Sequence, residues 1–516
     1  MSGSPVDRAT AQTLTRDLTA TAKKPIAVIA PFTGEAFHDL PQSTVADVEA
    51  AAEAARAAQR EWWGAGFAHR RRVLLRAHDL LLERRDELLD AVQTETGKTR
   101  GQAFEEVFQA AGATRYAALA ARRALAPSRR RGGIPLVIGT RVFYEPKGLV
   151  GVITPWNYPL SLGIMDVAPA LASGNGVVQK ADDQGALTIL TSRRAFVDAG
   201  VPAALWGVVC GPGAEIGTAV VDAVDYVCFT GSTATGKVVA ERASRRLIGV
   251  SLELGGKNPM IVLDDADPAK AAADAAYGCF SAAGQLCVSM ERIYVEKGVA
   301  DAFTAAFVER TRSLKLGTAF DYSTDAGSLA TKAQLERVTA HIDDAVKKGA
   351  TVLAGGERRP EIGPYFVEPT VLTGVTSEMS CSRDETFGAL VALQVVESAD
   401  EAVALANDSE YGLNASILSG SKRRALRLAR HLDTGSVNVN EGYRGSFSSV
   451  DAPMGGVKLS GLGRRNGAEG LLRFMEPHTI SHETGILQLP RTGAEFRRLA
   501  GPMILLLRIL KAIRRR

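Results

Sequence analysis

From residue 150 onward the chain alternates short apolar segments with helical ones, and this alternation constrains the fold more than any other feature. Strands are expected at 150–153, 177–179, 206–209 and 226–229. Helices are expected at 186–199 and 216–221. Strands that are joined by helices form a parallel sheet with helices on both faces. The sequence therefore predicts a doubly wound α/β domain of the nucleotide-binding type.

A second α/β unit is predicted beyond residue 256. Its strands are expected at 260–263 and 292–295, and its helices at 299–313 and 332–348. No low-complexity linker or internal repeat separates the two units in the sequence. A chain of 516 residues is long enough for two or three such domains.

The region before residue 150 is predicted to be mostly helical. Thr44-Val-Ala-Asp47 resembles a capping box, and apolar residues then recur at helical spacing up to Trp62. A single helix with one apolar stripe is expected from Arg70 to Val92. Residues 1–24 contain no apolar run of signal-peptide length and are expected to form a loose leader.

β structure is expected from 134 to 145, where Gly139 separates two apolar runs in the manner of a hairpin. The arginines at 122–123 and 129–131 could suggest a phosphate site. An exposed helix end and loop is the interpretation that we favour for them.

Composition argues against several classes of function. With 61 basic and 57 acidic residues the net charge is +4, which does not indicate a nucleic-acid partner for the whole chain. The cysteines are odd in number and form no CxxC pair, which argues against a disulfide framework or structural zinc and fits a reducing, cytoplasmic compartment. The seven histidines form no HExxH or HxH motif, so no metal site is predicted.

One glycine-rich segment is placed where a nucleotide phosphate would bind. Phe229-Thr-Gly231-Ser232-Thr-Ala-Thr-Gly236 follows a predicted strand and opens a helix. In that context glycines allow backbone N–H groups to approach a pyrophosphate. A tight strand–helix turn without a ligand is an equally good interpretation of these residues alone.

One cysteine is a candidate nucleophile. Phe280-Ser-Ala-Ala-Gly-Gln-Leu-Cys287 is expected to be a buried helix that presents Cys287 at its end. A helix terminus can lower the pKa of a thiol and so favour the nucleophilic thiolate. The alternative is an ordinary core cysteine, since free cysteines are commonly buried.

Two polar residues are candidates for the accompanying chemistry. Glu253 is the one acidic residue in an apolar strand that ends in two glycines, and an apolar setting raises a carboxyl pKa toward the range of a general base. Its alternative is a structural pair with Lys257 or a backbone donor. Asn157, in Thr154-Pro-Trp-Asn-Tyr-Pro159, could direct its amide at an oxyanion or serve as a turn former.

Together these segments resemble the NAD(P)-dependent aldehyde dehydrogenase superfamily over roughly residues 25–480. The motifs that carry the resemblance are PWNYP, FTGSTATG, LELGGKNP, AGQLC, ETFG, GSVNVN and MGGVKLSGLGRRNG, in that order. The resemblance implies that Cys287 is the nucleophile, Glu253 the base and Asn157 the oxyanion donor, together with the backbone N–H of Cys287. The implied reaction oxidises an aldehyde to a carboxylate through a cysteine thiohemiacetal and a thioester.

The resemblance also implies NAD or NADP as cofactor. Lys180 and Asp183 would hold the adenosine ribose, Ser232 the pyrophosphate, and Glu385 and Phe387 the nicotinamide end. Further cofactor contacts are implied for Thr154, Pro155, Trp156, Gly231, Gly236, Leu254 and Gly255. A carboxylate at Asp183 would repel a 2′-phosphate and so favours NAD, although the related semialdehyde enzymes often use NADP.

The sequences of segments 279–295 and 452–456 resemble those of actinobacterial succinate-semialdehyde dehydrogenases in particular. Succinate semialdehyde is therefore the expected substrate. Other enzymes of that specificity bind the distal carboxylate with arginines, but this chain has Met165 and Ser281 at the matching places. A positive residue from elsewhere would have to replace them. An uncharged medium- or long-chain aliphatic aldehyde is therefore the alternative substrate.

The domain organisation follows from the same resemblance. Residues 1–133 and 150–254 would form a Rossmann-type NAD(P)-binding domain, and residues 255–447 a second α/β domain that carries the nucleophile. Residues 134–149 and 470–490 would form a small β oligomerisation arm. In the family this arm joins subunits into a homodimer or homotetramer.

Residues 491–516 are expected to form a basic amphipathic C-terminal tail, and 502–516 is the least family-like part of the chain. If 502–516 is helical, Arg508, Lys511 and Arg515 share one face. This stretch is shorter than the roughly 20 apolar residues that cross a bilayer. Peripheral contact with the inner face of an anionic membrane and packing on a neighbouring subunit are the two alternatives.

Two other classes of function are compatible with a fold of this kind. A non-catalytic scaffold of the same fold would be indicated by the loss of Cys287, Glu253 or Asn157, and all three are present. A cysteine hydrolase would need a histidine base, and no histidine lies in any of the motifs.

Overall fold

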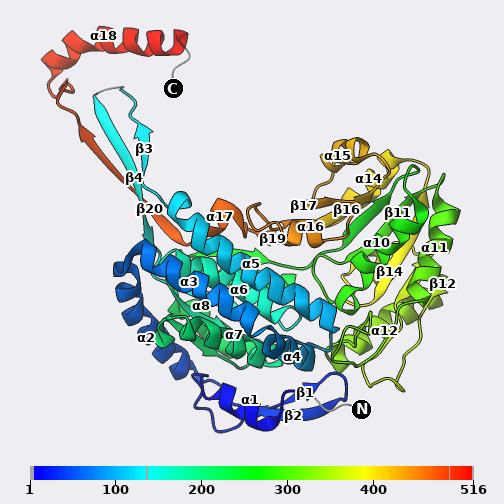
Figure 1. Cartoon of the computed structure of the whole chain (residues 1–516). Helices are drawn as coiled ribbons and strands as arrows, with labels where there is room; N and C mark the ends of the chain where they lie inside the picture. Colours follow the sequence, from blue (N-terminus) through cyan, green and yellow to red (C-terminus); the bar gives the residue numbers. More distant parts are fainter. Residues whose placement is uncertain (1–4, 135–136, 487, 514–516) are drawn as a thin grey trace.

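The computed structural model describes residues 5–134, 137–486 and 488–513, and Figure 1 shows two sheets with their helices and a projecting arm. The first sheet has six strands in the order β19-β9-β8-β5-β6-β7. Its strands are β5 Leu149–Ile153, β6 Gly176–Lys180, β7 Trp206–Val209, β8 Tyr226–Thr230, β9 Gly249–Glu253 and β19 Gly461–Leu462. All are parallel except β19, which confirms the predicted nucleotide-binding topology.

Helices cover both faces of this sheet because successive strand residues point to opposite sides. Val178, Val209 and Val227 pack against α2 (Val45–Gly64), α8 (Thr218–Ala223) and α9 (Thr233–Arg245). Their strand neighbours Val177, Val208 and Cys228 face the opposite core. That core is built by α3 Gly66–Glu83, α4 Arg85–Thr96, α5 Arg100–Ala124, α6 Pro159–Ala172 and α7 Ala186–Asp198.

The strand order changes direction between β5 and β8. From β5 the chain proceeds outward to β6 and β7, then returns to add β8 on the other side of β5. Such a switch point opens a crevice at the carboxyl ends of the two strands, where ligands of doubly wound sheets bind. The segments that follow β5 and β8 begin at Thr154 and Gly231.

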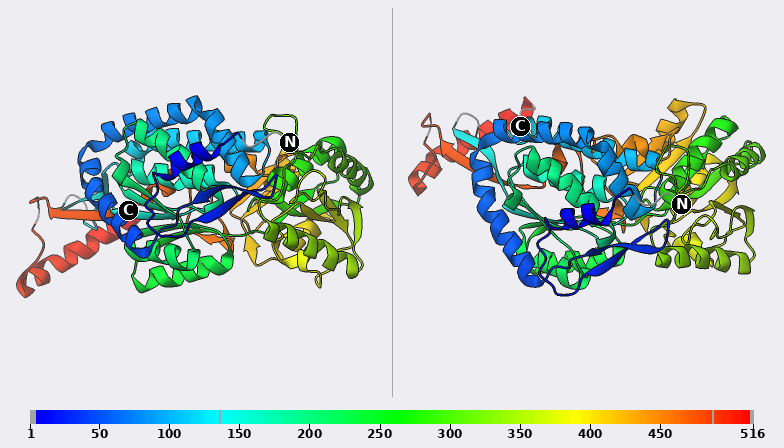
Figure 2. Two further views of the ribbon diagram at one scale, coloured as in Figure 1. Left: turned by 90° about the horizontal axis from the view of Figure 1, so that it is seen from below. Right: turned by 60° about the horizontal axis from the view of Figure 1, so that its bottom comes forward.

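The second sheet has seven strands in the order β12-β13-β14-β11-β10-β16-β17. Its strands are β10 Asn258–Val262, β11 Met290–Glu296, β12 Thr351–Ala354, β13 Thr370–Thr373, β14 Leu390–Val396, β16 Asn414–Leu418 and β17 Ser436–Val439. One face packs on α10 (Pro268–Phe280), α11 (Ala300–Arg312) and α12 (Lys332–Lys347). The other face is covered by α14 (Ala399–Asn407) and α15 (Lys422–Ala429), and Figure 2 shows the two sheet units side by side. The domain boundaries given above remain predictions.

The arm is a three-stranded antiparallel sheet of β3 (Ser128–Arg131), β4 (Ile138–Pro146) and β20 (Met475–Glu483). The predicted hairpin within 134–145 is wrong. Gly139 lies inside β4 between Arg131 and His482, because the partner of β4 is the arginine-rich segment before it. The prediction of a loop at 129–131 is therefore also wrong; residues 135–136 lie outside the described part of the chain.

Two predictions for the N-terminal region are also corrected. The helix expected from Arg70 to Val92 is interrupted at Arg84, which leaves helical geometry between α3 and α4. The predicted loose leader contains the helix α1 (Arg8–Thr15), which is capped by Asp7 and buries Leu14 in the core. The capping box at Thr44 and Asp47 is confirmed.

The remaining elements are short, apart from the C-terminal helix. They are β1 Ile26–Ala30, β2 Glu35–Leu40, β15 Tyr411–Gly412, β18 Val457–Lys458, α13 Ser380–Arg383, α16 Arg444–Phe447 and α17 Gly467–Leu472. The C-terminal helix α18 (Gly493–Ala512) lies across the tip of the arm in Figure 1. Across the described residues, no helix combines the length and the apolar character needed to cross a membrane.

Candidate active site

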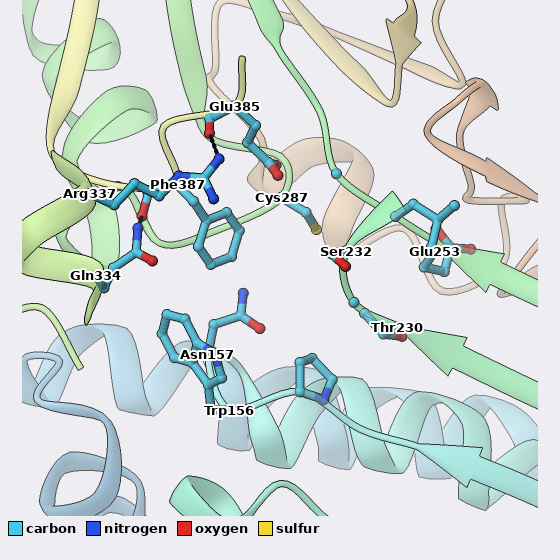
Figure 3. A pocket seen from close by; sticks show the side chains of 14 residues that line it. Trp156, Asn157, Thr230, Ser232, Glu253, Cys287, Gln334, Arg337, Glu385 and Phe387 are labelled. Atoms are coloured by element: carbon cyan, nitrogen blue, oxygen red, sulfur yellow. Dashed lines mark hydrogen bonds between the residues drawn. The ribbon is translucent and has the colours of Figure 1, made fainter. Parts of the chain in front are cut away.

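A cavity of about 180 Å³ lies where the carboxyl ends of β5, β8 and β9 meet the second sheet unit. Figure 3 shows side chains from both units converging on it. Its lining residues are Pro155, Trp156, Asn157, Thr230, Gly231, Ser232, Glu253, Leu254, Gly255, Cys287, Gln334, Arg337, Glu385 and Phe387. The three predicted catalytic residues Cys287, Glu253 and Asn157 are thus brought to one cavity from positions far apart in the sequence.

Cys287 lies on a turn, so the prediction of a continuous helix from 280 to 287 is wrong. Helix α10 ends at Phe280, and Ala282 and Ala283 adopt left-handed backbone angles with φ of 50° and 54°. Gly284 follows with φ of 73°, and a Cβ there would lie 2.1 Å from the carbonyl oxygen of Gly388. The close approach of these two backbones therefore forces the chain out of the helix before the cysteine.

Two asparagine side chains fix this turn. Asn258 Nδ2 donates to the carbonyl oxygens of Cys287 and Ser289, each at 2.7 Å. Asn414 Nδ2 donates to the carbonyl oxygen of Val288 at 3.0 Å, and its backbone N–H donates to Asn258 Oδ1 at 3.1 Å. The turn is therefore held by donors from the adjacent strands β10 and β16.

Asn157 is aimed at the same turn. Its Nδ2 donates to the carbonyl oxygen of Gln285 at 2.9 Å. Its own carbonyl oxygen accepts from Lys98 Nζ at 2.7 Å, and Lys98 is paired with Glu106 in full burial. Because a buried ion pair is costly to break, it fixes the backbone that carries the Asn157 amide.

Glu253 ends β9 with 4% of its surface exposed. No described residue donates a hydrogen bond to its Oε1, which is buried. The alternative pairing with Lys257 is wrong, because Lys257 is bound to Glu291. Burial raises the pKa of Glu253 to about 7, and the positive charge of Arg465 opposes that increase. A carboxyl group that titrates near neutral pH can act as a general base.

The expected lowering of the Cys287 pKa by a helix terminus is wrong. Burial and, to a smaller extent, the negative charges of Glu385 and Glu253 together raise the pKa of the Cys287 thiol to about 12. Two physical reasons combine here: the cysteine lies on a turn rather than at a helix end, and carboxylates are its charged neighbours.

A buried charge cluster that was not predicted from the sequence lies behind Glu253. Arg465 makes two hydrogen bonds to Asp166, at 2.9 and 2.6 Å, and Arg473 donates to the same carboxylate at 2.6 Å. Arg465 also donates to the hydroxyl of Thr230, which lines the cavity. One acidic residue inside the apolar helix α6 was the signal for this cluster.

Hydrogen bonds from several neighbouring elements hold the segment 385–387 in place. Glu291 accepts from the backbone N–H groups of Thr386 and Phe387, each at 2.9 Å. Glu385 accepts from the backbone N–H of Gly256 at 2.8 Å. Two further cavity residues, Gln334 and Arg337 of α12, donate to backbone carbonyls of this segment and were not predicted.

A second cleft of about 580 Å³ continues from the first along the β5–β8 switch point. The two share Pro155, Trp156, Thr230, Gly231 and Ser232. The predicted cofactor residues Thr154 and Lys180 line only the second cleft, and Leu254, Gly255, Glu385 and Phe387 line only the first.

Two predicted cofactor residues are not among the described residues that line either cavity. Gly236 lies where a Cβ would be 2.5 Å from Leu254 Cδ2, so its function here is to allow close packing of α9 on the strand end. Asp183 is half-buried, and its Oδ1 accepts from Gln42 Nε2 at 3.5 Å. Its neighbour Asp182, which was not predicted, does line the second cleft.

The residues of the second cleft suit a dinucleotide. Ser232 caps α9, whose N-terminus carries free N–H groups and a partial positive charge. Lys180, at the end of β6, adds a basic side chain to the lining. Trp156 lines both the cleft and the first cavity. The cleft thus combines N–H donors for phosphate groups with an aromatic ring next to the cavity of Cys287. Within the described ranges, no cluster of His, Cys, Asp or Glu is arranged to hold a metal ion.

The chain is similar in sequence and in structure to known dehydrogenases. Residues 18–480 match the aldehyde dehydrogenase family model. The chain is 51% identical over 90% of both chains to a putative succinate-semialdehyde dehydrogenase [NADP(+)] of Mycolicibacterium smegmatis, and 50% identical over 87% of both to one of Mycobacterium tuberculosis. An E. coli NADP-dependent enzyme has a TM-score of 0.86 at 32% identity, covering 90% of this chain and 96% of its own. A Staphylococcus aureus betaine aldehyde dehydrogenase in complex with NAD+ has a TM-score of 0.86 at 32% identity, covering 92% and 95%.

The buried carboxyl of Glu253 makes a testable contribution to stability. Its pKa is about 7 in the folded chain against an ordinary value of 4.5, so the folded state binds the proton more tightly. Stability from this group is therefore greatest below pH 4.5 and is lost as the pH rises through 7. Glu253→Gln removes that loss, on the order of 3 kcal/mol. We expect its thermal midpoint to rise relative to the parent between about pH 5 and 8.

Glu49→Gln, at an exposed position on α2, is the matched control and should keep a constant offset from the parent. An offset for Glu253→Gln that does not change with pH would show that this carboxyl titrates at its ordinary pKa.

Proposed function

Because this chain belongs to the aldehyde dehydrogenase family, we propose that it oxidises an aldehyde to the carboxylate with NAD(P)+. The observation that carries this proposal is the meeting of Cys287, Glu253 and Asn157 around one cavity that opens into a cleft of dinucleotide character.

The cofactor would occupy both clefts. Lys180 and the Asp182–Asp183 segment would hold the adenosine ribose, and Ser232 with the N-terminus of α9 would hold the pyrophosphate. Glu385 and Phe387 would position the nicotinamide end. When bound, the nicotinamide accepts the hydride that the substrate carbon gives up. The remaining steps belong to the side chains of the protein.

The first step is addition of the Cys287 sulfur to the aldehyde carbon. Since the thiol has a pKa of about 12 in the cavity, it must lose its proton as the bond forms. Glu253 is the carboxyl group in the same cavity with a pKa near 7, and it accepts that proton. The new oxyanion is held by Asn157 Nδ2, which exchanges the Gln285 carbonyl for it, and by the backbone N–H of Cys287.

The last step is hydrolysis of the thioester that remains on Cys287. Glu253 first releases to solvent the proton that it accepted in the first step, and then takes a proton from water as the water oxygen attacks the thioester carbon. The C–S bond breaks, and the Cys287 sulfur leaves as a thiolate that takes the acid proton, which gives the carboxylate product and the thiol. The unpartnered Oε1 of Glu253 is free to accept a hydrogen bond from that water. Arg465 limits how far the pKa of Glu253 rises, so that the base form is present at neutral pH.

We propose succinate semialdehyde as the substrate, in line with the names of the mycobacterial relatives. Met165 belongs to an apolar cluster with Tyr443 and Phe447, and Cys287 packs against that cluster. Ser281 directly precedes Ala282, another member of the cluster.

Two basic groups lie against the aromatic rings of this cluster. Lys98 Nζ is 3.5 Å from the ring centre of Tyr158 but is held in burial by Glu106. The guanidinium of Arg444 is 4.0 Å from the ring centre of Tyr277 and is paired with Glu441 at the surface. Arg444 is thus the proposed partner of the distal carboxylate.

The arm supports assembly. In the three-stranded sheet the edge strands are β3 and β20, and all described residues of β20 after Met475 are exposed. An uncovered antiparallel edge is a template for pairing with another chain. We therefore propose a homodimer or homotetramer formed through this arm.

A cytoplasmic location is proposed because all five cysteines are free thiols. We propose in addition that the C-terminal tail makes peripheral contact with the inner face of the membrane.

The nucleophile is tested by Cys287→Ser. We expect NAD(P)H formation, followed by absorbance, to fall by about 10³-fold or more, since a neutral hydroxyl is a much weaker nucleophile. Cys381→Ala, which removes a buried cysteine outside the cavity, should keep parental activity. Glu253→Gln should lower steady-state turnover by about 10²–10⁴-fold. Parental rates in Cys287→Ser would exclude the mechanism.

Nucleotide choice is tested at the two aspartates. Because Asp182 lines the cleft, Asp182→Asn should raise the ratio of kcat/KM for NADP+ to that for NAD+ by roughly tenfold. Asp183→Asn is the matched variant and should change the ratio less, because the Asp183 carboxylate is bound to Gln42 and is not among the residues that line the cleft. A larger change at Asp183 would assign the ribose contact to Asp183 instead.

The substrate is tested with Arg444→Gln. Loss of a charged hydrogen bond should raise KM for succinate semialdehyde about 10- to 100-fold. The KM for butanal, which lacks the distal carboxylate, should stay unchanged, and Arg423→Gln at an exposed position should affect neither. A parent enzyme that prefers long unbranched aldehydes to succinate semialdehyde would favour the aliphatic alternative.

A further inference from the structure

Helix α18 is a basic helix, rich in apolar residues, that the described fold does not cover. None of its side chains is buried. Large apolar residues that a folded chain normally hides are exposed along it, namely Phe496, Ile504, Leu505, Leu507 and Ile509, with Ile513 at its C-terminal end. Its spacing places Arg497, Arg508 and Lys511 together along one side of the helix.

The charge of the chain is concentrated in this region. Residues 491–516 contain eight basic residues and one acidic residue, so this segment carries +7. The whole chain carries +4, so the other 490 residues together carry −3. The sequence after Ile513 continues with three arginines that lie outside the described residues. A strongly cationic segment is thus attached to a slightly acidic body.

We propose that α18 binds flat on an anionic lipid surface, with its apolar side chains in the headgroup boundary and its basic side chains at the phosphates. Exposed apolar area and lysines or arginines beside it are the two features that such binding requires. The helix is neither long nor apolar enough to span the bilayer. In Figure 1 the helix lies at the tip of the arm, away from the two sheet units.

A second copy of the chain fits this helix less well. The cores of interfaces between subunits are depleted of charged residues, because each buried charge needs a partner. The segment supplies Glu495 as its one acidic residue, and that carboxylate is occupied by the backbone N–H groups of Arg491 and Thr492. Anionic lipid headgroups provide many negative charges without burying the basic ones.

This surface deepens the proposed membrane-side location and is independent of the dehydrogenase chemistry. It is tested with the full-length protein by flotation with phosphatidylcholine vesicles, with and without phosphatidylglycerol. We expect binding only to the anionic vesicles and release at high salt. The triple variant Arg497→Gln, Arg508→Gln, Lys511→Gln should lose affinity on the order of 100-fold. Phe496→Ser with Ile509→Ser should also lose binding.

The matched control removes three charges elsewhere, with Arg71→Gln, Arg122→Gln and Arg123→Gln at exposed positions of α3 and α5. It should bind anionic vesicles like the parent. All variants should oxidise a water-soluble aldehyde at the parental rate, which separates this proposal from the catalytic one. Absence of flotation, equal binding to neutral vesicles, or full binding by the tail variants would overturn the proposal. A drop in sedimentation mass on deleting 491–516, without vesicle binding in the parent, would assign the helix to a second copy.

Discussion

Three buried ion pairs fix the segments that line the cavity between the two sheet units. Lys98–Glu106 fixes the segment of Asn157, Lys257–Glu291 fixes the backbone of 386–387, and Arg465–Asp166 reaches the hydroxyl of Thr230. Each pair is almost fully buried. Because removing one partner would leave an uncompensated charge in a medium of low dielectric constant, each segment has one acceptable position. The backbone segments that carry the reactive groups are therefore held in fixed positions.

The same burial sets the electrostatics of the reaction site. Desolvation raises the pKa of Glu253 to about 7 and that of Glu385 to about 8. It also raises the pKa of Cys287, so the resting nucleophile is a protonated thiol beside carboxyl groups that titrate near neutral pH. Proton transfer between them needs no outside base. Arg465, which limits the rise in the pKa of Glu253, is itself paired with Asp166, and Arg473 shares that carboxylate.

The periphery follows a different physical rule. The arm and α18 expose backbone edges, apolar side chains and basic groups that the core would have to pair or bury. Such surfaces gain stability only from something outside the chain, another subunit or a lipid surface. The catalytic cavity thus lies between the two sheet units, whereas the proposed contacts with a second subunit and with lipid lie on the arm and on α18.

The sequence by itself determined the features that depend on near neighbours. Alternating apolar strands and helices predicted the parallel sheets, the Thr44–Asp47 capping box predicted a helix start, and the glycine-rich segment before α9 predicted a turn from a strand into a helix. These predictions are correct because the hydrogen bonds and side-chain directions of helices and strands repeat every few residues, so a short segment of sequence contains the pattern.

Tertiary structure decided the features whose partners are distant in the chain. The turn at Cys287 depends on Gly284 meeting Gly388, and the strand partner of Gly139 lies across the arm. The isolation of Glu253 follows because Lys257 is bound to Glu291. Local sequence patterns do not show how deeply a side chain is buried or which distant residue it contacts. Those two features determine the pKa values and the geometry of the site.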